Sequence, residues 1–94
     1  MSEAPQALAD LRREIDALDI EMVGLLARRL DVVHRVLAVK QAHGIPALLP
    51  DRVEDVVERV KAEAAAHDVP PDLVETLWRA LIGWTVAYEE KRLG

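Results

Sequence analysis

Two long basic side chains, Arg29 and Lys40, are spaced so that one helix could direct both at the same small anion. Lys40 follows Arg29 by eleven residues, which places it about 20° around a helix and about 16 Å along it. A guanidinium and an ammonium that converge in this way suit a dicarboxylate ligand. The simpler interpretations are a solvated surface position for Lys40 and, for Arg29, a snorkelling side chain or a charge that sets the register of a dimer.

Further polar candidates lie elsewhere in the chain. Arg12 precedes Arg29 by seventeen residues, about 25 Å along the same helix, so it could join that site only from a second chain. Arg52 begins a second helix and is free to point back. Thr85 and Glu89 are four residues apart on a third helix, at one edge of its apolar face and so near the interior. The simpler interpretation of Glu89 is an outward, solvated acid.

The sequence offers no group for covalent or metal chemistry. Ser2 is the only serine and lies at the N-terminus, and there is no cysteine and no glycine-rich phosphate loop. The three histidines, His34, His43 and His67, have no metal-ligand spacing. We therefore expect no metal, no cofactor and no covalent intermediate.

Three helices must position these side chains. Apolar residues recur every three or four positions and predict a first helix from about Gln6 to His43, which Gly44 and Pro46 break. Proline in a first turn predicts a second helix from Pro50 to near His67 and a third from Pro70 to almost Gly94. The fold class is all-α, with a long, a short and a medium helix. The expected apolar faces contain Leu8, Leu11, Ile15, Leu18, Met22, Leu25, Val32, Val36 and Val39, then Val53, Val56, Val57 and Val60, then Leu73, Leu77, Trp78, Leu81 and Trp84.

The length of the first helix predicts an assembly. A helix of roughly 35 residues is about 50 Å long, whereas a compact domain of 94 residues is only about 30 to 35 Å across. The two later helices cannot cover its whole apolar seam, so we expect residues 1–94 to form one domain that dimerises. A plain dimeric coiled coil is the simpler alternative. Arg29 stands in a heptad position where an apolar residue is expected, and only together with Lys40 on the same face does it favour a ligand site in the seam.

Composition restricts the partners and the compartment. The chain has a net charge of -5 and no basic stripe interleaved with aromatic residues, so we expect no nucleic-acid partner. No apolar run approaches the roughly 18 residues of a membrane span, and no membrane association is expected. The absence of cysteine suits a reducing compartment, and we expect a cytoplasmic protein.

The segments Leu11–Asp19, Leu25–Arg29 and Pro50–Arg52, together with Lys40, resemble the all-helical AroQ class of chorismate mutases. The match covers nearly the whole chain. In that family two three-helix chains interlock as a homodimer with two equivalent active sites. The resemblance implies an isomerase of the shikimate pathway and aromatic biosynthesis, which rearranges chorismate, a dicarboxylate, to prephenate by Claisen-type pericyclic chemistry without a cofactor.

The resemblance also implies a role for each matching residue. Lys40 would face the ether oxygen, where negative charge grows during bond breaking, and the arginines would clamp the carboxylates. Glu89 matches a glutamine that donates to the same ether oxygen, so Glu89 would have to be protonated to help. Thr85 matches a small hydroxylated residue near a carboxylate. The implied site comprises Arg29, Lys40, Arg52, Thr85 and Glu89 of one chain and Arg12 of the other.

Two departures from the family pattern keep other substrates open. Val53 stands where the typical mutase has a glutamate that binds the ring hydroxyl. The segments Pro50–Val53 and Ile82–Ala87 look like isochorismate pyruvate lyases, and Val53 with Glu89 looks like 4-amino-4-deoxychorismate mutases. Chorismate mutase remains the first hypothesis because the substrate class and chemistry are shared. The alternative from a different class is a non-catalytic dimerisation or regulatory module, against which four matching cations argue.

Overall fold

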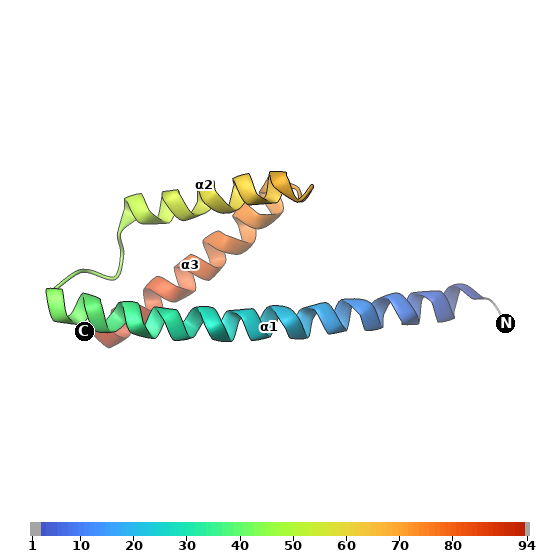
Figure 1. The fold of residues 1–94 in the computed structure, drawn as a ribbon, viewed down its shortest axis with the longest axis horizontal. Coiled ribbons are helices and arrows are strands. Elements are labelled where there is room, and N and C mark those ends of the chain that lie inside the picture. The colour runs from blue at the N-terminus through green and yellow to red at the C-terminus, as the bar shows by residue number, and fades with distance from the viewer. Residues whose placement is uncertain (1–2, 94) are drawn as a thin grey trace. The chain divides into compact units, whose positions relative to one another are not determined.

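The computed structural model describes residues 3–93, and within them it contains three α-helices and no strand. The helices are α1 (Glu3–His43), α2 (Pro50–Ala66) and α3 (Pro71–Leu93) (Figure 1). The predicted all-α class and the long, short, medium order are confirmed. In the described part of the chain, no helix combines the length and the apolar character needed to cross a membrane.

Two helices end in the same way. Gly44 follows α1 with a left-handed φ of 64°, and the amide of Ile45 donates to the Lys40 carbonyl at 2.9 Å. After α2, Asp68 has a φ of 56°, and the amide of Val69 donates to the Ala64 carbonyl at 2.8 Å. This is the Schellman arrangement, in which a left-handed residue closes the last turn. A proline follows each turn two residues after the left-handed residue, which prevents the helix from continuing.

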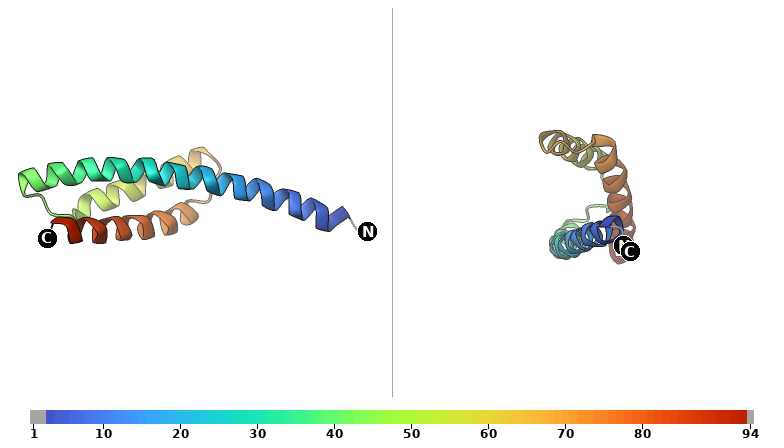
Figure 2. Two further views of the ribbon diagram at one scale, coloured as in Figure 1. Left: turned by 90° about the horizontal axis from the view of Figure 1, so that it is seen from below. Right: turned by 90° about the vertical axis from the view of Figure 1, so that its right-hand side faces the viewer.

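The chain divides into two compact units, the first ending at Arg35 and the second beginning at Val36. The second unit contains the last turns of α1, the loop that follows, and α2 and α3. Within it α2 and α3 pack against each other in opposite directions from the turn that joins them (Figure 2). Its core is small. The buried apolar residues are Leu37, Ala47, Val57, Ala64 and Ile82, and the buried polar residues are Thr85 and Glu89.

An arginine fork joins α2 to α3 at the surface. Arg79 on α3 donates to both carboxylate oxygens of Glu54 on α2, at 3.0 Å each, and its Nε donates to Glu75 at 2.9 Å. Lys61 on α2 lies 3.5 Å from Glu75. Hydrogen bonding by Arg79 lowers the pKa of both Glu54 and Glu75, and the two carboxylates raise the pKa of Arg79. These ion pairs therefore link fixed positions of α2 to fixed positions of α3.

The first unit is helical and leaves its apolar seam exposed. The exposed seam residues include Leu8, Leu11, Ile15, Leu18, Met22 and Leu25. The predicted inner face of α3 is also only partly correct, because Leu73, Leu77 and Trp84 are exposed while Ile82, Thr85 and Glu89 are buried. Trp84 stacks on Tyr88 with ring centroids 4.9 Å apart, and the Arg92 guanidinium lies 3.5 Å from the centroid of the Tyr88 ring. The chain thus buries one face of α3 and exposes another rich in apolar groups.

Candidate active site

Lys40 and Glu89, which the sequence placed in one site, are in direct contact. Lys40 lies in the last turns of α1 and Glu89 in the last turns of α3. The Lys40 Nζ donates to Glu89 Oε1 at 2.8 Å, and the two side chains are only 12% and 8% exposed. Neither residue is therefore a solvated surface charge. Helix periodicity gave no sign of the contact itself, because it does not place one helix against another.

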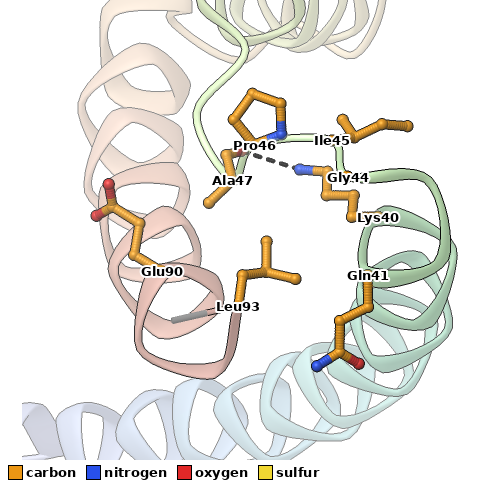
Figure 3. A pocket seen from close by; sticks show the side chains of 8 residues that line it. All are labelled: Lys40, Gln41, Gly44, Ile45, Pro46, Ala47, Glu90 and Leu93. Carbon is orange, nitrogen blue, oxygen red and sulfur yellow. Dashed lines mark hydrogen bonds between the residues drawn. The ribbon is translucent and has the colours of Figure 1, made fainter.

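The carbonyl of Ala47 is a second acceptor for Lys40, and sequence reasoning missed it. Ala47 is buried in the loop between α1 and α2, and its carbonyl oxygen accepts from the Lys40 Nζ at 2.9 Å (Figure 3). An ammonium group has three hydrogens to donate. Glu89 and Ala47 occupy two of them. Gly44 and Pro46 predict the end of the helix, but not which carbonyl the following loop presents to Lys40.

Thr85 lies one turn before Glu89 on the same face of α3. It is 8% exposed, and its hydroxyl donates to the Leu81 carbonyl at 2.8 Å. The predicted interior placement of Thr85 and Glu89 is confirmed. A pocket of about 520 Å³ adjoins Lys40 on the side of the loop and of the end of α3 (Figure 3). Its walls are formed by Lys40, Gln41, Gly44, Ile45, Pro46, Ala47, Glu90 and Leu93.

Arg52 is held by its own helix. Its Nη1 donates to Asp55 Oδ2 at 2.7 Å, and the same carboxylate accepts from Arg59 at 3.0 and 3.1 Å. The hydrogen bond from Arg59, with a smaller one from Arg52, lowers the pKa of Asp55. Arg52 is exposed and Val53 beside it is half-buried. One Arg52 hydrogen is thus used by Asp55, and the other guanidinium hydrogens remain to bind a ligand.

Arg12 and Arg29 belong to the first unit, and Lys40 and Glu89 belong to the second. Arg12 is exposed and Arg29 is half-buried. A hollow of about 600 Å³ on this unit is lined by Arg28, Arg29 and Arg35 together with Asp31, which lies 3.5 Å from Arg35. Three arginines to one aspartate give the hollow a positive character suited to carboxylates. Among the described residues, no group of three or more His, Cys, Asp or Glu side chains could hold a metal ion.

The family model for chorismate mutase type II matches residues 11–90, which include every predicted site residue. The chain belongs to the chorismate mutase type II family. Membership in the chorismate mutase type II family agrees with the resemblance drawn from the sequence motifs of this chain.

Three relatives give the scale of the similarity. The T-protein of Haemophilus influenzae is 51% identical over 47 residues, which is 50% of this chain and 12% of that protein. The T-protein of Enterobacter agglomerans is 39% identical over 75 residues, 80% of this chain and 20% of its own length. The 4-amino-4-deoxychorismate mutase of Streptomyces venezuelae is 41% identical over 46 residues, 49% of this chain and 45% of that protein. The chain thus spans a fifth or less of either T-protein.

Proposed function

We propose that this protein is a chorismate mutase, an isomerase that rearranges chorismate to prephenate in the shikimate pathway. The observation that carries the proposal is the buried Lys40–Glu89 pair, with its 2.8 Å contact, in a chain that matches the family model over residues 11–90. The reaction needs a site that matches its transition state in shape and charge, and it needs no nucleophile. A buried cation with a hydrogen left to donate suits it.

In the proposed mechanism Lys40 acts on the breaking ether bond. Negative charge grows on the ether oxygen as that bond breaks, so a fixed N–H from Lys40 stabilises the transition state more than the ground state. Arg29 and Arg52 clamp the two carboxylates and hold the reacting carbons in a near-attack arrangement, which lowers the entropic part of the barrier. Thr85 lies beside a carboxylate, and Val53 contacts the ring where other members of the family bind its hydroxyl.

The proposed active unit is a homodimer in which Arg12 of one chain completes the site of the other. The support is the exposed apolar seam of the first unit, which includes Leu11, Ile15 and Leu18 at 55% to 56% exposure. Apolar surface of that extent on one helix face is stabilised by burial against another chain. We propose residues 1–94 as a single domain of this dimer, located in the cytoplasm and without nucleic-acid or membrane partners.

Product analysis tests the activity. The protein is incubated in turn with chorismate, isochorismate and 4-amino-4-deoxychorismate, and products are separated by chromatography. Prephenate from chorismate is expected, at a rate that Lys40→Met lowers strongly and that Lys91→Met, which removes an exposed lysine of α3, leaves unchanged. If only isochorismate or only 4-amino-4-deoxychorismate were turned over, that compound would replace chorismate as the assigned substrate. If none of the three compounds were turned over, the proposed enzymatic activity would be refuted and a non-catalytic module would be favoured.

A further inference from the structure

The turns after α1 and α2 are nearly equivalent in backbone, but only the first contacts a proposed active-site residue. Gly44 and Asp68 have φ values of 64° and 56°, and in each turn the amide of the following residue donates to a helix carbonyl five residues back, at 2.9 or 2.8 Å. In the turn at Gly44 the accepting carbonyl belongs to Lys40. The turn at Asp68 uses Ala64, whose side chain has no polar atom. The turn at Asp68 can therefore serve as a control for the turn at Gly44.

Lys40 forms hydrogen bonds to the loop after α1 through both its backbone and its side chain. Its backbone carbonyl accepts from the Ile45 amide at 2.9 Å, and its side-chain Nζ donates to the Ala47 carbonyl at 2.9 Å. Figure 3 shows the Lys40 side chain extending across the loop toward that carbonyl. A left-handed residue at position 44 directs the chain back over the helix end, which brings Ala47 within reach of the ammonium.

The two acceptors of the ammonium differ in charge. The Glu89 carboxylate opposes the positive charge of Lys40 and so weakens its effect on any third group. The Ala47 carbonyl has no net charge, so it orients the ammonium and leaves its charge intact. Lysine is a flexible four-carbon chain ending in a rotatable ammonium. One acceptor leaves it free to swing about a single hydrogen bond, and two acceptors fix the direction of the third hydrogen.

We propose that Gly44 is a positioning residue: its left-handed turn presents the Ala47 carbonyl to Lys40, which with Glu89 fixes two ammonium hydrogens and directs the third at the substrate. This inference rests on the proposed function for the identity of that substrate. It assigns to a backbone carbonyl and a loop glycine a part in the reaction that no side-chain motif indicates. Gly44 itself touches no reacting atom.

Three variants separate positioning from stability. Gly44→Ala places a side chain at a left-handed φ, although nothing lies within 4 Å of the added Cβ, so its effect is on backbone conformation alone. Gly44→Asn is the conservative variant, because asparagine tolerates this conformation. Asp68→Ala changes the matched turn, which contacts no proposed site residue. The urea midpoint of unfolding is measured for each, so that kinetic losses can be compared with losses of stability.

We expect Gly44→Ala to lower kcat about tenfold, as a small misplacement of a catalytic group does, with KM changed less than about twofold. Gly44→Asn should recover most of the lost kcat. Asp68→Ala should shift the urea midpoint and leave kcat unchanged. The proposal is overturned if Gly44→Ala retains full kcat, or if Asp68→Ala loses as much kcat for a similar shift in midpoint.

A second measurement does not depend on activity. Nitrogen-15 NMR of the lysine ammonium groups follows the exchange of their hydrogens with water, with the Lys40 signal assigned by its loss in Lys40→Arg. In the wild type, Lys40 should exchange more slowly than exposed Lys91, and Gly44→Ala should accelerate Lys40 alone. Exchange as fast as that of Lys91 in the wild type would overturn the positioning role. If no substrate is turned over, the proposed function fails, while this exchange result still decides the role of Gly44.

Discussion

The carboxyl group of Glu89 has no hydrogen to donate while it is ionised, and its Oε1 lies 2.8 Å from the Lys40 Nζ. In the proposed site both side chains face the ether oxygen of the substrate. An ionised Glu89 there repels the charge that develops on that oxygen and also opposes the charge of Lys40. A neutral group at this position that still accepts from Lys40 would avoid both effects.

Glu89→Gln supplies such a group. Its amide oxygen can accept from Lys40 as the carboxylate does, and its amide nitrogen can donate to the ether oxygen at every pH. We expect kcat/KM near neutral pH to rise about two- to tenfold, the value of one additional hydrogen bond. The measurement is kcat/KM of both proteins at neutral pH. A value for Glu89→Gln that is equal to or below that of the wild type would place Glu89 away from the ether oxygen.

Lys40→Met removes the ammonium and keeps an unbranched side chain of similar length. Because the charge on the ether oxygen appears only in the transition state, we expect kcat to fall on the order of a hundredfold or more and KM to change much less. Steady-state kinetics on the active substrate measure both. The result would count against a catalytic role if kcat stayed normal and only KM rose, since Lys40 would then serve binding alone.

For the polar residues Thr85 and Glu89, the sequence predicted burial but not the contacts that each side chain makes. Thr85 and Glu89 were expected near the interior from their spacing, and both are buried. The Lys40–Glu89 contact joins residues 49 positions apart on two different helices. The spacing of residues within one helix does not predict a contact between helices. The Ala47 carbonyl was missed because any residue type provides one.

The local sequence predicts the ends of the helices more directly than it predicts how the helices pack. Proline at the start of α2, and Gly44 with Pro46 after α1, predicted those boundaries because each residue restricts the backbone itself. The predicted first helix began at about Gln6, inside the observed start at Glu3, because a proline such as Pro5 is tolerated anywhere in the first turn and does not mark its first residue. The fork from Arg79 to α2 was not predicted, since it depends on the angle at which two helices cross.

Acid should loosen the α2–α3 pair. Arg79 lowers the pKa of Glu54 and of Glu75 below the ordinary value of 4.5. Groups with a lowered pKa in the folded state stabilise it above their unfolded pKa, and this stabilisation is lost as pH falls through the lowered value. We expect the free energy of unfolding of the wild type to decline as pH falls below about 4.5, and Arg79→Met to reduce that decline. The Glu54 side chain is exposed and that of Glu75 is half-buried, so solvent screens both carboxylates and the effect should be small.

Urea unfolding at a series of pH values measures this dependence. Arg79→Lys is the matched control, because it keeps the charge and loses the fork that reaches both oxygens of Glu54. Its pH dependence should lie between those of the wild type and Arg79→Met. Parallel curves for all three proteins would show that the fork does not contribute to the acid response of the fold.

The whole molecule requires a second chain in the proposed active form, because Arg12 is expected to enter the partner's site. Each site of the dimer would then need Arg29 and Lys40 from one chain and Arg12 from the other. Mixing inactive Arg12→Ala with inactive Arg29→Ala should restore activity, since one site of each mixed dimer receives every cation. Recovery of up to about a quarter of wild-type activity is expected from random pairing of chains with one intact site per mixed dimer.

A mixture of Arg29→Ala with Lys40→Met is the control, because both residues come from the same chain and neither site is complete. It should stay inactive after subunit exchange, confirmed by mass spectrometry of tagged chains. Equal recovery in the two mixtures, or none in the first, would contradict shared sites. The sequence predicted the need for a partner from the length and apolar seam of the first helix. It could not define the interface, which depends on the shapes of two surfaces together.

The small core has a consequence for how the protein responds to dilution. Among the residues whose burial the structure describes, only five apolar ones are buried, while the seam of α1 and the residues Leu73, Leu77 and Trp84 of α3 are exposed. In the proposed dimer, much of the apolar surface available to stabilise the fold would be covered only on association, and mass action would then couple the folded fraction to protein concentration. Each tenfold dilution would then lower the folded fraction, as added urea does. In a cell, the level of expression would itself help set how much of this chain is folded.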